Sequence, residues 1–598
     1  MSLSFLRVSF IFLGLMAGAC IDIPEVQPVA EDTDAGPVAP GDASTPDSGV
    51  PSLQLVLVTS RTATNGSLGV SVELNGPTPE LVELLVDGES VATLLPPYMK
   101  QLDTQGLAEG QHVLHIRATL GSKVFLSAPQ PLTVDRSAPS WVSRTPSTGA
   151  ALVPVNHVVQ AVFSERLDSA TVHSTSVRMF AGANIIAADV SLSVDGTTVT
   201  VSPLSRPPLD VLVKVMFADS VTDVAGNSVP AGEAWSWSLP GFLPLGDFLF
   251  TESRTDTSAL YEALQLDTAG RPVVAWVDEL RNGVYVRRWT GETWELLGAG
   301  LRTDSPSQLP TGLALALDAN DEPVVAWSEF HGSVVYVHRW NGTGWEAMGA
   351  PVPSPLNPWS VALGRSAAGQ WYLGFASGNF EGSQLLVWRW ESDHWSQLGA
   401  ALKVVPTASM IGPRMDFRGA QGPLVRWTEW STTGDDWGYM RRWQAGSWQA
   451  IPLPSQNPGG VWGLDALERP LNLLASSGDE VRLRAWDGLD WVQLGAPMAG
   501  RFAGATQVAA LGLSLDPAGN PVVLLREAEV PEQAESFYVR RLRDGAWEDW
   551  GGLLRPLPEG ARSKYPLFAV MPSGRVLMVR AESTAPNVWP IRVYISNE

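Results

Sequence analysis

A twelve-residue pattern that recurs along the second half of the chain restricts its fold more than any other feature. One copy is RWNGTGWEAMGA, which begins at Arg339. The other copies start at Arg288, Arg389, Arg442, Ala485 and, in a worn form, Arg541. The tryptophan at the seventh position of each copy is Trp294, Trp345, Trp395, Trp448, Trp491 or Trp547. A unit repeated about every 50 residues indicates a repeat architecture, in which each unit buries its apolar face against the next.

Each repeat unit reads as four short strands joined by hairpins. The second unit, GLALALDANDEPVVAWSEFHGSVVYVHRWNGTGWEAMG, alternates apolar runs with turns rich in Asp, Asn and Gly. Its first turn recurs as LDTAGRP and LDPAGNP, where Pro opens the next strand at a position that tolerates a missing N–H. The twelve-residue pattern is therefore the third and fourth strands with their hairpin, and we expect Trp340 and Trp345 to pack against neighbouring sheets.

The number of units predicts a closed ring. Six full units run from about Thr257 to Gly552, and a seventh reads as only three strands. The segment FLPLGDFL, Phe242 to Leu249, ends like the fourth strand of the first unit. We expect Leu243–Phe250 to pair with Trp589–Ser596, because a strand borrowed from the other end of the repeat region removes a free sheet edge. Residues 241–598 are thus predicted to form a seven-bladed β-propeller closed by an N-terminal strand.

Two smaller β-rich regions precede the repeats. Residues 53–136 carry VELLVDGESVATL and the alternating HVLHIRA, a pattern that resembles a bacterial Ig-like module. Residues 137–240 contain FSERLDSATV and DVAGN, at Phe163–Val172 and Asp223–Asn227, which resemble the signatures of the S-layer-type bacterial Ig-like domain. The resemblance implies spacer modules of extracellular proteins. The expected fold class is all-β: two Ig-like β-sandwiches followed by the seven-bladed β-propeller.

The first 52 residues read as a targeting segment and a tether. Arg7, an apolar run and then Cys20, the one cysteine of the chain, resemble a bacterial lipoprotein signal, although Ala17 stands where Leu is usual. The resemblance implies that residues 1–19 are removed and that Cys20 is lipidated; the alternative is ordinary cleavage after Ala19 and secretion. Residues 20–52 are acidic and Pro-rich, which predicts a disordered tether. Ile21 favours the outer membrane, so we expect a lipid-anchored protein of the cell envelope.

Composition and motifs exclude several classes of function. The formal net charge of −22 argues against nucleic acid as a partner. The chain has no phosphate loop, dinucleotide fingerprint, zinc-ligand spacing or Gly-x-Ser-x-Gly elbow. Its NGTGW and DGLDW turns are similar to the sialidase box but lack the Ser-x-Asp half, and the predicted propeller has no cysteine for a Kelch-type copper oxidase. We therefore assign no catalytic residue and expect no cofactor. Calcium is the one metal for which the sequence offers candidate ligands.

Acidic residues end five of the seven predicted second strands. They are Asp278, Glu329, Glu429, Glu527 and Glu582. Neighbouring carboxylates repel one another unless a cation, an arginine or a basic partner neutralises them. One hypothesis is that they form a rim that binds calcium, a basic group or a polyhydroxylated ligand. The alternative is a solvated rim, or pairing with arginine between blades.

Together these features predict a cell-envelope-anchored protein whose propeller binds a surface glycan or an envelope protein, in adhesion or envelope organisation. Its other contact is with the membrane, through the lipid on Cys20. Two alternatives stay open: a glycan-acting hydrolase or lyase that uses carboxylates on the propeller face, and a purely structural spacer protein. A pocket with two carboxylates about 5–10 Å apart would indicate the hydrolase, whereas a shallow aromatic and polar face would indicate a binding protein.

Overall fold

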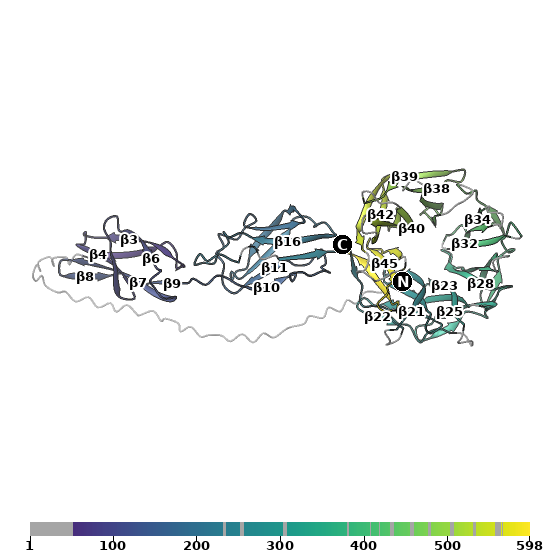
Figure 1. Ribbon diagram of the computed structural model, residues 1–598, viewed down its shortest axis with the longest axis horizontal. Helices are drawn as coiled ribbons and strands as arrows, with labels where there is room; N and C mark the ends of the chain where they lie inside the picture. Colours follow the sequence, from purple (N-terminus) through teal and green to yellow (C-terminus); the bar gives the residue numbers. More distant parts are fainter. Residues whose placement is uncertain are drawn as a thin grey trace, which may run out of the picture.

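The computed structural model describes residues 52–597 and consists of strands joined by turns and loops. Its gaps are residues 231, 233–234, 252–255, 303–307, 330, 379–381, 407, 418, 431–435, 455–459, 476–479, 503–507, 530–533, 556–563 and 565. Cys20 and nearly all of the predicted tether lie outside these residues. Figure 1 shows two sandwiches in line, followed by a ring of sheets. Within the described part, no helix has the length and apolar character needed to cross a membrane.

The first sandwich packs a three-stranded sheet against a six-stranded one. The first sheet has the order β1 (Gln54–Thr59), β3 (Ser67–Asn75), β6 (Met99–Asp103). The second has the order β2 (Ala63–Thr64), β9 (Gln130–Val134), β7 (Gly110–Leu120), β4 (Leu81–Val86), β5 (Glu89–Thr93), with β8 (Lys123–Leu126) paired to β7. The alternation in β7 is confirmed, because Leu114, Ile116 and Ala118 are fully buried.

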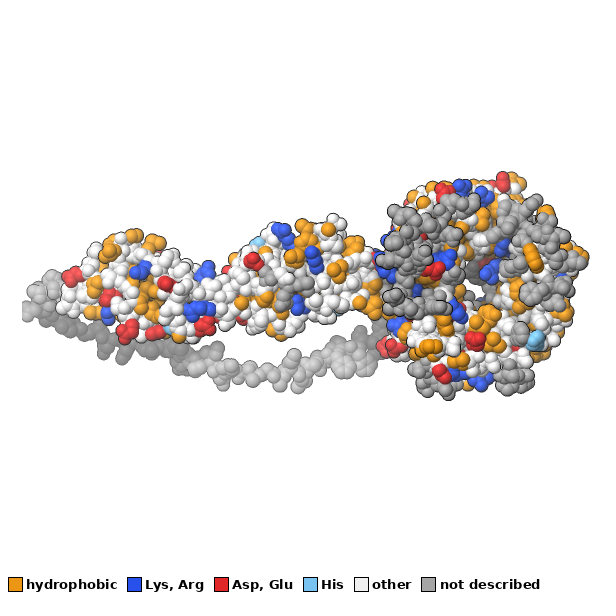
Figure 2. Space-filling model, viewed as in Figure 1, with side chains coloured by type: hydrophobic (Ala, Val, Ile, Leu, Met, Phe, Trp, Pro, Cys, Tyr) orange, Lys and Arg blue, Asp and Glu red, His pale blue; other side chains and the backbone are white. Residues whose placement is uncertain are grey.

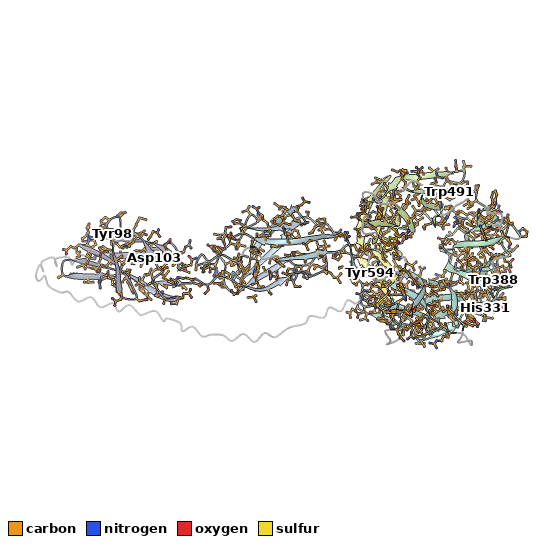
Figure 3. The ribbon with its side chains drawn as sticks, viewed as in Figure 1. Tyr98, Asp103, His331, Trp388, Trp491 and Tyr594 are labelled. Atoms are coloured by element: carbon orange, nitrogen blue, oxygen red, sulfur yellow. The ribbon has the colours of Figure 1, made fainter. Side chains whose placement is uncertain are left out.

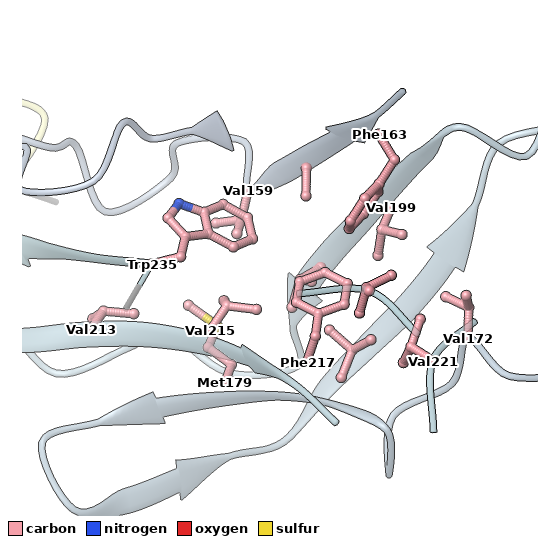
Figure 4. Close-up of a cluster of buried hydrophobic side chains, with 14 of the residues drawn as sticks. Val159, Phe163, Val172, Met179, Val199, Val213, Val215, Phe217, Val221 and Trp235 are labelled. Atoms are coloured by element: carbon pink, nitrogen blue, oxygen red, sulfur yellow. The ribbon is translucent and has the colours of Figure 1, made fainter. Parts of the chain in front are cut away.

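The second sandwich packs two four-stranded sheets around aromatic side chains. Its sheets are β10 (Trp141–Thr145), β11 (Gln160–Phe163), β15 (Thr198–Pro203), β14 (Ala188–Leu192), and β13 (Asn184–Ile186), β12 (Val177–Ala181), β16 (Val211–Phe217), β17 (Trp235–Leu239). Phe163, Phe217 and Trp235 meet between the sheets, as Figure 4 shows. The Trp235 indole nitrogen donates a hydrogen bond to the Pro146 carbonyl at 2.7 Å, which satisfies its one polar atom.

The third part is a ring of seven sheets, which is the predicted β-propeller. Blade 1 has the described strands β19–β22 (Ala259–Leu266, Pro272–Asp278, Gly283–Trp289, Trp294–Leu296), and blade 2 has β23–β26 (Pro310–Leu317, Pro323–Glu329, Val334–Trp340, Trp345–Ala347). Blade 3 has β28–β31 (Pro358–Arg365, Trp371–Ser377, Gln384–Glu391, His394–Gln397), and blade 4 has β32–β35 (Ser409–Asp416, Leu424–Trp430, Asp436–Gln444, Ser447–Ala450). Blade 5 has β36–β39 (Val461–Leu464, Pro470–Ala475, Glu480–Trp486, Trp491–Ala499), and blade 6 has β40–β43 (Val508–Leu515, Pro521–Glu529, Ala534–Arg543, Ala546–Leu554). A short extra strand, β27 (Val352–Pro353), joins blade 2. Acidic and basic side chains are interspersed over the face in Figure 2.

Blade 7 closes the ring with strands from both ends of the repeat region. Its order is β18 (Phe242–Pro244), β46 (Ile591–Ser596), β45 (Val576–Ala581), β44 (Leu567–Val570). Phe242 pairs with Ser596 and Leu243 with Ile595, and a further bridge joins Leu249 to Ile591. The closing segment thus pairs with the last strand over Phe242–Pro244 and at Leu249, rather than along the whole of Leu243–Phe250.

The tryptophans of the repeat join each blade to the one before it. The Trp345 indole nitrogen donates a hydrogen bond to the Leu297 carbonyl of the preceding blade at 2.8 Å. Gly298 has a φ of 66°, and a Cβ added there would lie 2.9 Å from a Trp340 ring carbon. Only glycine fits this position, because it needs both a left-handed backbone and space for the ring. Equivalent indole hydrogen bonds are made by Trp294, Trp395, Trp448, Trp491 and Trp547.

Two polar side chains fasten the second sandwich to the ring. Asp210 accepts hydrogen bonds from the backbone N–H groups of Gly241 and Leu553, at 2.8 and 2.7 Å. The Asn597 amide accepts from the Val155 N–H at 2.8 Å and donates to the Val153 carbonyl at 3.0 Å. The sandwich is therefore joined to blades 6 and 7 by hydrogen bonds as well as by the chain.

Candidate functional site

The five acidic residues predicted as a ligand-binding rim are all buried in the described structure. Asp278, Glu329, Glu429 and Glu527 lie at or near the ends of second strands, and Glu582 directly follows one. Their exposed fractions are 0%, 6%, 1%, 0% and 3% in sequence order. The alternative of a solvated rim is therefore wrong.

Glu429 and Glu527 hold the connections that lead into their own blades. The Glu429 carboxylate accepts hydrogen bonds from the N–H groups of Val404 and Val405, at 2.7 and 2.6 Å. Glu527 accepts in the same way from Arg501 and Phe502, at 2.7 and 2.9 Å. A backbone N–H that is partly removed from water needs an acceptor, and these loops have no sheet neighbour to provide one. The repeated carboxylate thus acts as an anchor for the connection between blades.

Two of the other acids are paired with arginine. Asp278 accepts a hydrogen bond from Arg281 Nη1 at 2.8 Å, and Glu582 accepts one from Arg580 Nε at 2.7 Å. Among the described residues, none of the five belongs to a group of three side chains close enough to hold a metal ion. Acidic residues also occur in the loops between second and third strands, and four of them, Glu381, Asp435, Asp479 and Glu532, lie outside the described residues. Ligand binding by the five acids stays a prediction.

The arginine that opens the twelve-residue pattern lies opposite the start of a second strand. Arg288 pairs with Val273, Arg339 with Val324, and Arg541 with Val522. The Arg541 guanidinium lies 4.2 Å from the centre of the Trp550 ring. These contacts indicate a structural role for this arginine.

A pocket of about 740 Å³ lies where the first strands of blades 1 to 4 meet the loops between second and third strands. Tyr261, Thr311, Trp359 and Arg414 come from those first strands, and His331 comes from a loop. Figure 3 shows His331 on the part of the ring away from the second sandwich, whereas Tyr594 lies beside that sandwich. The pocket is thus at the inner edge of the ring, clear of the junction with the sandwiches.

Irregular backbone shapes this pocket. The pairing of first and second strands shifts register between Ala259 and Glu262, between Pro310 and Gly312, and between Trp359 and Ala362. The residues inside these shifts include Tyr261, Thr311 and Ser360, which all line the pocket. Ser360 and His331 have φ values of 51° and 60°, which are strained for residues with a side chain. Bulges and strained residues concentrate where side chains are redirected for function.

The pocket wall combines aromatic rings with polar groups that are free to bind. Tyr261 is 42% exposed and Trp359 is half-buried. The Tyr261 hydroxyl, the Trp359 indole nitrogen and the Asn357 side-chain amide make no hydrogen bond to another described residue. Thr311 Oγ1 and Ser328 Oγ are 3.2 Å apart. The wall therefore offers flat apolar surfaces beside several hydrogen-bonding groups, as small-molecule sites do.

Ionisable groups in the pocket are few. Glu329 is the one carboxylate among the described lining residues, and Arg414 and His331 are the exposed cationic or protonatable groups. A glycoside hydrolase that uses two carboxylates would need a second acid there. Sequence reasoning missed Tyr261, Asn357, Trp359 and Arg414, because nothing in the repeat pattern indicates a bulge in the first strand.

A second group of polar residues lies between the two sandwiches. Carboxylate oxygens of Asp135, Glu165 and Asp223 lie within 4.8 Å of one another. Burial raises the pKa of Glu165 to about 7, and the negative charges of Asp135 and Asp223 contribute to the shift. Asn227, from the DVAGN motif, donates hydrogen bonds to the Asp223 carboxylate at 2.8 Å and to the Asp135 carbonyl at 3.0 Å. The motif therefore organises the junction between the sandwiches.

We expect the stability of this junction to fall as pH rises toward 8. The pKa of Glu165 is higher in the folded chain than in the unfolded one, so its contribution is fully present below about pH 4.5 and is lost through pH 7. The full chain is unfolded thermally, with a chelator, at pH 5 and at pH 8. The difference in unfolding temperature between the two pH values should be smaller for Glu165→Gln than for wild type. Glu73→Gln, at an exposed position, is the control. An equal difference in all three proteins would contradict the prediction.

Comparison with known proteins identifies the second sandwich. A family described as "Bacterial Ig-like domain" matches residues 135–238. No curated protein matches the chain. Similar solved structures include a polysaccharide lyase of family PL25, an ulvan lyase (12% identity, 59% of this chain, 96% of that chain, TM-score 0.41), the SapL1 lectin in complex with alpha methyl fucoside (15%, 51%, 98%, 0.31) and an α-L-arabinanase of Penicillium chrysogenum (13%, 51%, 100%, 0.34). At such identities and TM-scores, none of these likenesses assigns a ligand to this chain.

Proposed function

We propose that the propeller binds a glycan in the pocket at the inner edge of blades 1 to 4. The observation that carries this proposal is the combination of the Trp359 and Tyr261 rings with the uncommitted amide of Asn357. A sugar ring has an apolar C–H face that packs on an aromatic ring, and hydroxyl groups around its edge that need hydrogen-bond partners. The lining offers both kinds of contact within one cavity.

We further propose that the propeller is displayed on the cell envelope, in adhesion or envelope organisation. The two sandwiches precede the ring in the chain and lie in line with it, which supports a role as spacers (Figure 1). Lipidation of Cys20 and placement in the outer membrane belong to this proposal and rest on the signal-like sequence. Secretion remains the expectation if Cys20 is not lipidated.

A glycan-acting enzyme is the second candidate. Glu329 and His331 both line the pocket, and both side-chain types can transfer protons at a bound sugar. Incubating the full chain with the oligosaccharides that it binds, followed by mass spectrometry, separates the candidates. Shortened or unsaturated products would indicate an enzyme, and intact oligosaccharides a binding protein.

We expect Trp359→Ala to weaken glycan binding by about 10- to 100-fold, because an aromatic ring at the centre of a binding site commonly contributes a few kcal/mol. The measurement is calorimetric titration of the full chain, in detergent, with neutral and acidic oligosaccharides. Trp437→Ala is the matched control, since Trp437 is 42% exposed and lies outside the pocket lining. Equal losses in both variants, or no binding of any oligosaccharide by wild type, would contradict the proposed site.

A further inference from the structure

Arg414 is the arginine of the pocket wall. It is exposed, it lines the pocket, and its one hydrogen bond is from Nη1 to the adjacent Pro413 carbonyl at 3.5 Å. It forms no ion pair with a carboxylate in the described part of the chain. Arginines elsewhere in the ring, such as Arg281 and Arg540, are paired with acids at 2.8 Å. In a chain with 62 acidic and 40 basic residues, an unpaired guanidinium inside a cavity needs an explanation.

A second positive charge lies directly across the sheet. Arg414 in β32 pairs with Arg426 in β33. Arg426 is 8% exposed, and its guanidinium lies 4.9 Å from the centre of the Trp462 ring. Burial lowers the pKa of Arg426 to about 10, and the charge of Arg414 contributes to that shift. Like charges directly opposite each other in a sheet destabilise it, so an anion bound at Arg414 would relieve this repulsion.

The other ionisable groups of the pocket leave this charge in place. Glu329 belongs to a different blade, is 6% exposed and is already engaged by a partner. His331 is exposed and adds positive charge when it is protonated. The accessible charge of the cavity is therefore positive, although the whole chain carries a net charge of −22.

We propose that the pocket selects anionic sugars, with Arg414 binding a carboxylate or sulfate group while Trp359 packs on the sugar ring. This inference rests on the proposed glycan-binding function and names the class of ligand. The planar fork of a guanidinium can donate two parallel hydrogen bonds to a carboxylate or a sulfate, which a lysine cannot reproduce. A neutral sugar would leave Arg414 without a counter-charge.

The test compares a sugar acid with its neutral ester and adds a sulfated sugar. The full chain, in detergent, is titrated with an oligogalacturonate, with its neutral methyl ester, and with a carrageenan oligosaccharide that carries sulfate. We expect a charged probe to bind at least about 10-fold more tightly than the ester, because hydrogen bonds to charged groups are the stronger ones. Binding of the galacturonate assigns the site to carboxylates, and binding of the carrageenan assigns it to sulfates.

Substitution of the arginine provides the second arm. Arg414→Gln should weaken binding of the charged probe by about 10- to 100-fold and leave the ester unaffected, while Arg414→Lys should restore only part of the loss. Arg339→Gln removes an equal charge from a half-exposed outer position and should change nothing. A thermal unfolding curve of each variant verifies that the fold is intact.

The outcomes separate the two proposals. Equal binding of acid and ester, or an Arg414→Gln variant that keeps its affinity, overturns the selection of anions and leaves glycan binding standing. Binding of neutral sugars alone likewise overturns the selection of anions and leaves glycan binding standing. If wild type binds no sugar, neutral or charged, the proposed function itself fails.

Discussion

Deleting residues 242–250 is expected to abolish the cooperative unfolding transition of the propeller. Phe242 is 3% exposed and packs with side chains of blades 6 and 7, and Leu249 is fully buried. Loss of one buried phenylalanine costs about 3–5 kcal/mol, which is a large part of the 5–15 kcal/mol that stabilises a typical domain. The deletion also leaves β46 as a bare edge, so the ring can no longer hold its first and last blades together. Scanning calorimetry of the full chain measures the effect.

A deletion of equal length is the control. Removal of residues 30–38, within the acidic and Pro-rich segment, should leave the propeller transition unchanged. A propeller that still melts in one sharp transition, within a few degrees of wild type, after loss of 242–250 would show that the closing strand is dispensable.

Replacing Glu527 with alanine should lower the free energy of unfolding by about 3–5 kcal/mol, because removing the acceptor leaves one buried and two partly buried donors without a partner. Those donors are the N–H groups of Arg501 and Phe502 and the Tyr538 hydroxyl, which donates to Glu527 at 2.8 Å. Glu527→Gln keeps one acceptor oxygen and should cost less. Denaturant unfolding measures both.

Glu548→Ala in the same blade is the matched control. Glu548 pairs with Arg541 at the surface, with 42% of its side chain exposed, and such pairs contribute only about 0–1 kcal/mol. Similar losses for Glu527→Ala and Glu548→Ala would mean that the carboxylate does not anchor the connection. A Glu527→Gln protein of normal stability that binds no sugar would instead support the predicted ligand-binding role.

The sequence predicted the fold where the pattern is local. The alternation of Leu114 and Ile116 and the hairpin of Trp340 and Trp345 follow from residue order within a short segment, and the closing strand at Phe242 follows from its likeness to the fourth strand of the first unit. The second-strand ends were also located, but not the burial of their acids. That burial depends on loops such as Val404–Val405, whose backbone N–H groups carry no sequence signal.

The pocket was harder to predict because its determinants lie between repeats. Tyr261, Trp359 and Arg414 occupy first strands of three different blades, and no fixed spacing connects them. Bulges moved them out of the regular alternation on which a sequence pattern depends. Arg414 lies opposite a second arginine, Arg426, only after the two strands have paired, so the sequence alone does not bring the two charges together.

The position of β18 in blade 7 also has a consequence for biosynthesis. β18 leaves the ribosome before any other strand of the ring, and its partner β46 is the last to be made. At about 5–20 residues per second, the closing strand waits roughly 20–70 s for its partner. During that interval an apolar strand with an unpaired edge can pair with another polypeptide chain and aggregate. We expect a chaperone, or export in an unfolded form, to protect the segment around Phe242 until synthesis reaches Ile591.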